Sequence, residues 1–253
     1  MSKPRNLTAS ALGLALVTSP IAAVEGAELK VIAGGSMTAS LNQLGAEFEK
    51  ASGHRLSIHF DSTPNIIARV TSGTPFDLAV VPVDVFRDAA AKARFVAGPT
   101  LDIARVGYGV IVRAGELRPD VSTPEAFKKA LLDTPSIAFL PASAAGAYVT
   151  NVFERLGIAE EMKAKTKVQA TPAQIAPAVA KGDAELGVFL TNVLIAPGVE
   201  LVGPFPAELQ QELVFAAAIA ADTQQADAAK AFIDYLKTPA AVAVIKAAGM
   251  IPG

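Results

Sequence analysis

Short apolar runs with strand-like patterning alternate along the chain with longer segments whose apolar residues recur at helical spacing. The strand-like runs cover residues 29–33, 54–60, 76–81, 106–112, 136–140, 186–190 and 212–220. The helical segments cover residues 37–50, 66–72, 148–156, 172–181, 223–237 and 239–248, and a further helical segment begins at residue 124. Such alternation predicts βαβ units and therefore an α/β fold, with mostly parallel sheets flanked by helices on both faces.

Local signals mark the ends of several of these helices. Ser36 and Thr123 stand where N-cap residues belong, because their side-chain oxygens can accept from the free N–H groups of a first turn. Gly53 and Gly157 follow two helices as stop residues. Pro177 lies inside the segment 172–181 and predicts a kink or a break there, since proline has no N–H to donate.

Length and composition narrow the class of protein. The chain has 253 residues, 51% of them hydrophobic, and a formal net charge of −2. This amount of apolar material supports a substantial core, and the charge balance gives no basic footprint for nucleic acid. The chain has no cysteine and two histidines, which excludes disulfides, thiolate chemistry and zinc ribbons. No repeat or long linker interrupts it, so we expect two α/β lobes rather than independent domains.

The first 27 residues have the pattern of a secretory signal peptide. Lys3 and Arg5 come first, an apolar stretch of about a dozen residues follows, and small residues lead to Ala27. The apolar stretch is too short, and too broken by Thr18 and Pro20, to span a bilayer. We therefore expect a protein that is exported, with cleavage near Ala27.

Hydroxyl-bearing and small residues gather at several strand-to-helix junctions. They are Ser36 and Thr38, then Ser62 and Thr63, and finally Ser143 to Gly146. In an open α/β sheet, ligands bind beyond the carboxyl ends of the strands, where helix N-termini present free N–H groups and a partial positive charge. Together these loops predict a site that binds an anion through neutral dipoles. The alternative is that each residue only caps its helix.

Catalytic and metal-binding motifs are missing. The sequence has no G-x-S-x-G elbow, phosphate-binding loop, S-x-x-K or H-E-x-x-H pattern. His54 and His59 are five residues apart on a predicted strand and would face opposite sides, so we expect no joint metal site. Asp61, Asp77 and Asp84 lie beside turns, where aspartate most often makes local hydrogen bonds. We predict no enzyme, no metal and no cofactor.

The order of these segments resembles the periplasmic molybdate-binding proteins of ABC importers. The matching stretches are residues 29–38 (LKVIAGGSMT), 60–63 (FDST), 73–78 (GTPFDL), 145–148 (AGAY), 182–188 (GDAELGV) and 231–240 (AFIDYLKTPA). The resemblance covers nearly the whole chain after the leader. It implies a two-lobed periplasmic-binding-protein fold of type II with two crossover hinge strands. Lobe one would comprise residues 28–107 and 212–253, and lobe two residues 108–211.

The resemblance also implies ligand-binding residues. The family's oxyanion donors fall on Ser36, with Met37 beside it, and on Ser62 or Thr63. The backbone donor of the second lobe falls on Ala145, next to Gly146, and a further backbone contact maps near Gln174. The family's tyrosine hydroxyl falls on Leu190, which has no donor, and Asn192 is among the residues that could replace it.

These observations predict a periplasmic solute-binding protein of an ABC importer, active as a monomer. It would capture a small anion in the cleft, either an oxyanion of the molybdate and tungstate type or a small carboxylate, and deliver it to an inner-membrane permease. Two alternatives stay open, namely an exported sensor that presents its ligand to a receptor and an enzyme on the same scaffold. No nucleic acid and no membrane anchor are expected.

Overall fold

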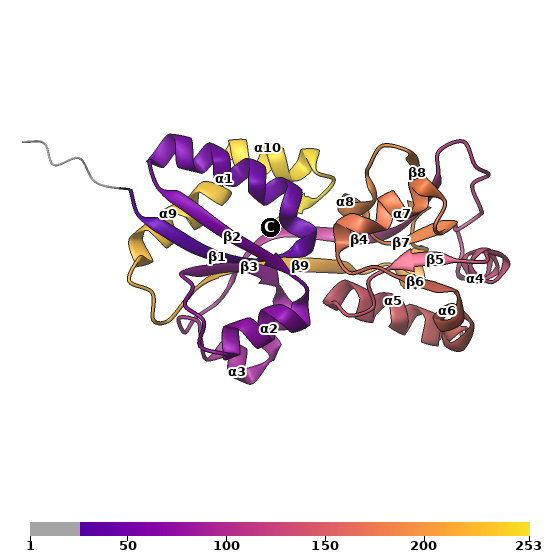
Figure 1. The fold of residues 1–253 in the computed structure, drawn as a ribbon, viewed down its shortest axis with the longest axis horizontal. Helices are drawn as coiled ribbons and strands as arrows, with labels where there is room; N and C mark the ends of the chain where they lie inside the picture. Colours follow the sequence, from indigo (N-terminus) through magenta and orange to yellow (C-terminus); the bar gives the residue numbers. More distant parts are fainter. Residues whose placement is uncertain (1–25) are drawn as a thin grey trace, which may run out of the picture.

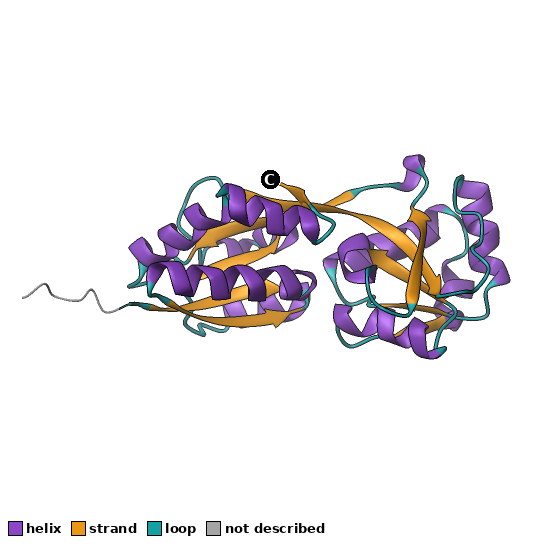
Figure 2. Ribbon diagram, turned by 90° about the horizontal axis from the view of Figure 1, so that it is seen from above, coloured by secondary structure: helices purple, strands orange, loops and turns teal. Residues whose placement is uncertain are grey.

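The computed structural model describes residues 26–253, so the predicted leader lies almost entirely outside the described residues. The described part forms two lobes joined by two long strands (Figures 1 and 2). These strands are β4 (Leu101–Arg113) and β9 (Glu212–Ile219). None of the helices in residues 26–253 combines the length and the apolar character that a membrane span requires.

The first lobe is a sheet with helices on both faces. Its other strands are β1 (Glu28–Gly34), β2 (Arg55–Asp61), β3 (Leu78–Pro82) and β10 (Ile251–Pro252). Its helices are α1 (Thr38–Ser52), α2 (Thr63–Thr71), α3 (Ala89–Lys92), α9 (Ala226–Leu236) and α10 (Pro239–Ala247), with 3₁₀ turns η1 (Gly35–Met37) and η2 (Val83–Arg87). In Figure 1, α1, α9 and α10 lie on one side of the sheet, and α2 and α3 on the other.

The second lobe is built from the chain between the two long strands. Its strands are β5 (Ile137–Phe139), β6 (Thr166–Val168), β7 (Leu186–Leu190) and β8 (Val199–Pro204). Its helices are α4 (Pro124–Asp133), α5 (Ala144–Arg155), α6 (Ala159–Lys165), α7 (Ile175–Lys181) and α8 (Thr191–Leu194), with turns η3 (Pro172–Gln174) and η4 (Ala207–Leu209).

Strand direction follows the connections between the strands. β1 pairs in parallel with β2 and β3, and β5 pairs in parallel with β6 and β7, as helical crossovers require. β9 and β4 run antiparallel to their neighbours, so the sheets are mixed near the centre of the molecule. Parallel pairing therefore holds within the βαβ units, and the crossover strands supply the antiparallel pairs.

β4 changes partners at the junction between the lobes. Gly107 is the last residue that pairs with β9, and Tyr108 is the first that pairs with β7. At this point the side-chain amide of Gln210 accepts from the Tyr108 N–H at 2.8 Å and donates to the Tyr108 carbonyl at 2.9 Å. The Gln210 side chain thus satisfies both backbone groups of Tyr108, which would be costly to leave unpaired. The Tyr108 ring is buried, and that burial raises the pKa of its hydroxyl.

The core follows the alternation of side chains along the strands. Leu29, Val31 and Ala33 of β1 belong to a large apolar cluster that extends through both lobes. Ile32, between them, points to the other face and joins Ile66 in a smaller cluster under α2 and α3. Burial on both faces explains the uninterrupted apolar run Val31 to Ala33 in β1, whereas Glu28 and Lys30 before it are exposed.

The structure confirms several helix ends and corrects one. The Thr123 Oγ1 accepts from Ala126 N–H at 3.1 Å, and Gly53 and Gly157 adopt positive φ angles of 77° and 69° where their helices end. The prediction that Ser36 caps a helix is wrong. Ser36 lies inside η1, and neither η1 nor α1 has a side-chain cap.

Pro177 is accommodated without a kink at its own position. The segment 172–181 divides instead into η3 and α7, and Pro177 is the third residue of α7. The first N–H groups of a helix have no acceptor within it, so the N–H that proline lacks is not needed there. The predicted break is present, three residues before the proline.

Candidate functional site

A small cavity lies between the lobes, where three parallel strands end. Its volume is about 20 Å³, which is room for a group of only a few atoms. The polar part of its lining comes from the last residues of β1 and β2 and from the segments after β1, β2 and β5, namely Gly34 to Ser36, Asp61 to Thr63, and Ser143 to Ala145. The carboxyl ends of β1, β2 and β5 therefore converge on one point, as expected for a ligand site in this class of fold.

At the N-terminus of α5, one backbone N–H group beside this cavity is unpaired among the described residues. The first backbone hydrogen bond of the helix runs from Ala147 N–H to the Ser143 carbonyl at 2.8 Å. Of the three N–H groups before it, that of Ala144 donates to Thr63 Oγ1 at 3.2 Å and that of Gly146 to Ser143 Oγ at 2.9 Å. The Ala145 N–H has no acceptor among the described residues. A buried, unpaired donor at a helix N-terminus is a ready partner for an anion.

The first lobe contributes hydroxyl groups. Ser36 and Ser62 line the cavity, and their side chains make no hydrogen bond within the part of the chain that the structure describes. Thr63 is buried, and its Oγ1 accepts from Ala144 but donates to no described atom. Three hydroxyl protons and one backbone N–H are thus available around the same small space.

Asp61 is the one ionisable residue in the described lining. Its Oδ1 accepts from Ser62 N–H and from Asn65 Nδ2, both at 2.7 Å, and its Oδ2 lies 3.5 Å from His59 Nε2. These contacts tie the carboxylate to the start of α2. They also occupy the Ser62 N–H, so Ser62 has only its hydroxyl to offer a ligand. Among the residues that the structure describes, no lysine or arginine lines the cavity.

The two lobes are in contact around the cavity. The bond from Ala144 N–H to Thr63 Oγ1 crosses between them, and so does the bond from Asn192 Nδ2 to the Ser36 carbonyl at 2.8 Å. Gly35 packs closely against Pro172, since a Cβ on Gly35 would lie 3.3 Å from Pro172 Cδ. The structure is therefore a closed arrangement in which the cavity is walled on both sides.

Four of the residues singled out from the sequence line this cavity: Ser36, Ser62, Thr63 and Ala145. Met37 and Leu190 are fully buried in the apolar core instead. Leu190 ends β7, and its neighbour Phe189 is the residue of that strand that reaches the cavity.

The other three residues are engaged elsewhere. The Gly146 N–H is taken by Ser143, as described above. Gln174 Oε1 accepts from the N–H groups of Ala170 and Thr171 at 3.0 and 3.2 Å and so closes the turn before α7. Asn192 lines a neighbouring groove of about 380 Å³ between the lobes, which shares Gly35, Ser36 and Pro172 with the small cavity. None of the three lines the small cavity.

An apolar wall completes the cavity, and sequence reasoning did not find it. Besides Pro172, it consists of Pro82, Leu140, Phe189, Leu213 and Phe215. Leu213 and Phe215 come from β9, far along the chain from the hydroxyl-bearing loops. In the sequence they are recognisable only as part of an apolar run. Core residues also lie in such runs, so the pattern does not distinguish a cavity wall from the core.

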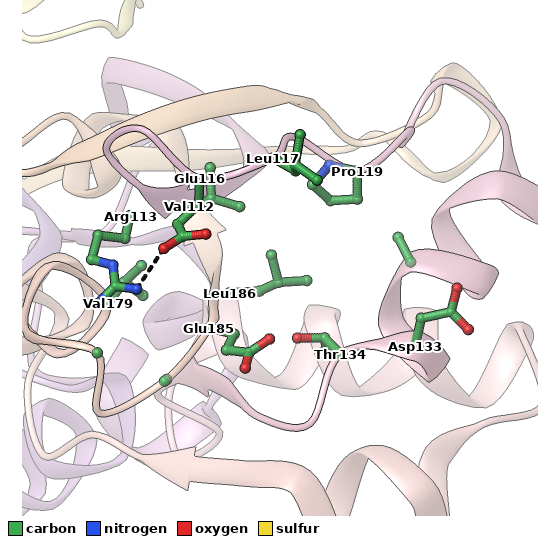
Figure 3. Close-up of a pocket in the computed structure, with 13 residues that line it drawn as sticks. Val112, Arg113, Glu116, Leu117, Pro119, Asp133, Thr134, Val179, Glu185 and Leu186 are labelled. Carbon is green, nitrogen blue, oxygen red and sulfur yellow. Dashed lines mark hydrogen bonds and ion pairs between the residues drawn. The ribbon is translucent and has the colours of Figure 1, made fainter.

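A larger hollow at the outer end of lobe two has the wrong charge for an anion (Figure 3). Its volume is about 590 Å³, and its lining includes three carboxylates, on Glu116, Asp133 and Glu185. Its one arginine, Arg113, is paired with Glu116 at 2.5 Å. The net negative lining would repel an anion.

Comparisons with known proteins agree with this geometry. A family model described as bacterial extracellular solute-binding protein matches residues 29–251. The molybdate-binding protein ModA of Azotobacter vinelandii is 31% identical, over 94% of each chain. The aconitate isomerase of a Pseudomonas species is 27% identical, over 98% of this chain and 97% of that protein. The solved Azotobacter vinelandii periplasmic molybdate-binding protein superposes with a TM-score of 0.74 at 24% identity, over 89% of this chain and 99% of that one.

Proposed function

Because the chain belongs to the family of bacterial extracellular solute-binding proteins, we propose that it captures one compact anion between its lobes for an ABC importer. The protein is exported to the periplasm, works as a monomer and passes its ligand to an inner-membrane permease. Residues 28–107 and 212–253 form one binding lobe, and residues 108–211 form the other. The ligand is bound without chemical change.

The observation that carries this proposal is the unpaired Ala145 N–H at the cavity. It comes from lobe two, whereas the free hydroxyls of Ser36 and Ser62 come from lobe one. An anion can accept from the Ala145 N–H and from both hydroxyls only when the two lobes are in contact. Closure on a ligand by hinge motion about β4 and β9 follows from that division of donors.

The type of donor favours an anion that carries several bare oxygen atoms. Hydroxyls and N–H groups satisfy such oxygens, and the partial positive charge at the α5 N-terminus offsets part of the negative charge. The cavity of about 20 Å³ favours a compact ligand, and a tetrahedral oxyanion such as molybdate or tungstate is more compact than a tricarboxylate. The similarity to a molybdate-binding protein supports the same choice.

A small carboxylate is the second candidate, and two observations favour it. The position that carries a hydroxyl in the molybdate-binding pattern is Leu190 here, which is buried and has no donor. One relative is an aconitate isomerase, a name that refers to a tricarboxylate. One carboxylate group would fit the cavity, but the rest of such a ligand would hold the lobes further apart.

Thermal unfolding of the mature protein against a panel of anions tests the proposal. The panel contains molybdate, tungstate, sulfate, phosphate, citrate and aconitate. A ligand present at a hundred times its dissociation constant should stabilise the folded protein by about 2.7 kcal/mol, because it binds the folded state alone. We expect this increase with molybdate or tungstate and none with chloride at equal ionic strength.

The same panel separates the candidates. Stabilisation by aconitate or citrate alone would replace the oxyanion by a carboxylate. Interconversion of cis- and trans-aconitate by the purified protein, followed by nuclear magnetic resonance, would contradict binding without chemistry. Absence of any stabilisation across the panel would count against the proposed function as a whole.

A further inference from the structure

Asn192 is a side chain of lobe two whose amide nitrogen is bound entirely by lobe one. It lies at the start of α8, directly after β7. Its Nδ2 donates to the Ser36 carbonyl at 2.8 Å and lies 3.6 Å from the Sδ of Met250. Ser36 is 156 residues away in sequence, and its hydroxyl lines the anion cavity. The Asn192 amide therefore binds the backbone of a residue that lines the cavity.

The other atom of this amide is buried without a partner. Asn192 Oδ1 accepts no hydrogen bond from any described residue. Reversing the amide would not help, because Oδ1 would then face the Ser36 carbonyl oxygen, and two acceptors repel each other. Closure thus gives Asn192 one hydrogen bond across the lobes and deprives its second polar atom of water. An unpaired buried acceptor opposes the closed state.

We infer that Asn192 is a positioning residue that links lobe closure to the ligand through Ser36, without touching the ligand itself. This inference rests on the proposed function, because it assigns a role in closing the same site. The hydrogen bond from Nδ2 sets where the Ser36 loop stands in the closed form. The unpaired Oδ1 raises the free energy of the closed form, so that the ligand-free protein is closed for only part of the time and the anion completes closure.

The decisive variant is Asn192→Asp, which keeps the size of the side chain and removes its donor. A carboxylate oxygen would face the Ser36 carbonyl in the closed form, so closure is disfavoured. We expect the affinity for every anion that the wild-type protein binds to fall about tenfold or more, by the same factor, at pH 7.5. The order of affinities within the panel stays unchanged, because Asn192 contacts no ligand.

A pH profile distinguishes this role from a general loss of structure. Burial and the neighbouring carbonyl raise the pKa of a carboxyl group at position 192 above its ordinary value of about 4. In acid the protonated carboxyl donates to the Ser36 carbonyl again. The groove beside Asn192 is lined, within residues 26–253, by no ionisable side chain that would compete. The affinity ratio of variant to wild type should therefore recover as the pH falls from 7.5 to 5.

The matched control is Asn151→Asp, the same change at an exposed position on α5 of the same lobe. It should leave affinity, its pH profile and closure as in the wild type. Unchanged affinity in Asn192→Asp would overturn the inference. So would a changed order of affinities, which would make Asn192 a ligand contact.

Closure itself is measured with spin labels, which the absence of native cysteine makes simple. Labels at Ala51→Cys on α1 and Lys181→Cys on α7 report the distance between the lobes from two exposed positions. We expect Asn192→Asp to shift the distribution toward the open form, with saturating anion and without it. If the wild-type protein binds no anion, the proposed function fails. The ligand-free distributions then decide the inference, and identical ones overturn it.

Discussion

Replacing Ser36 and Ser62 together by alanine should weaken anion binding by roughly 100-fold or more while leaving the fold intact. Each hydroxyl lines the cavity and makes no other hydrogen bond among the described residues. A hydrogen bond to a charged group is worth about 1.5–3 kcal/mol, and two are removed here. Isothermal titration calorimetry with the anion of the panel that binds most tightly measures the loss of affinity.

The fold should survive because neither hydroxyl makes a hydrogen bond that stabilises it. Removal of an unbonded hydroxyl changes stability by no more than about 0.5 kcal/mol. The control is Ser57→Ala, an exposed position on β2 that does not line the cavity. Full affinity in the double variant would show that these hydroxyls are not ligand donors. A large drop in Tm without ligand would show instead that they serve the fold.

Gly146→Ala should both destabilise the protein and weaken binding. A Cβ at position 146 would lie 1.8 Å from the carbonyl oxygen of Leu140, which is backbone and has little freedom to yield. The start of α5 would have to move away from β5. Overpacking of this severity costs about 3 kcal/mol, or roughly 6–12 °C in Tm for a chain of this size. The displacement also moves the neighbouring Ala145 N–H out of line with the cavity.

The comparison for this variant is Gly203→Ala in β8. There the nearest atom to a new Cβ is Val121 Cγ2 at 3.4 Å, an ordinary contact. Differential scanning calorimetry and titration of the two variants give the separate losses. The two variants could also show the same Tm and the same affinity. In that case the close approach of α5 to β5 does not determine the position of the Ala145 N–H.

The sequence predicted the elements well where local chemistry decides them. β7 was predicted with the bounds that the structure has, because an apolar run of five residues fills a strand buried on both faces. β6 and β8 were not predicted. The residues of β6 are polar or exposed, and those of β8 are only partly buried, so neither strand shows the apolar signal of a core strand.

The candidate site was predicted in part, for a physical reason. Ser36, Ser62, Thr63 and Ala145 stand at strand ends, and strand ends can be recognised from local patterns. The local sequence does not show whether a given hydrogen-bond donor already has an acceptor within the protein. The Ala144 N–H is taken by Thr63 from the other lobe, and Asn192 binds Ser36 across 156 residues. Such pairings depend on how the lobes meet, which no short stretch of sequence records.

The place of β9 has a consequence for the order in which the chain folds. β9 lies between β3 and β4 in the sheet, although all of lobe two separates it from them in sequence. The strands β5 to β8 come from one continuous stretch and can assemble early, whereas β3 has no partner on that side until residues 212–219 arrive. Pairings at such sequence separation form slowly. On the proposed export of the chain across the inner membrane, a central strand that arrives late would keep the first sheet incomplete until nearly the whole polypeptide has passed.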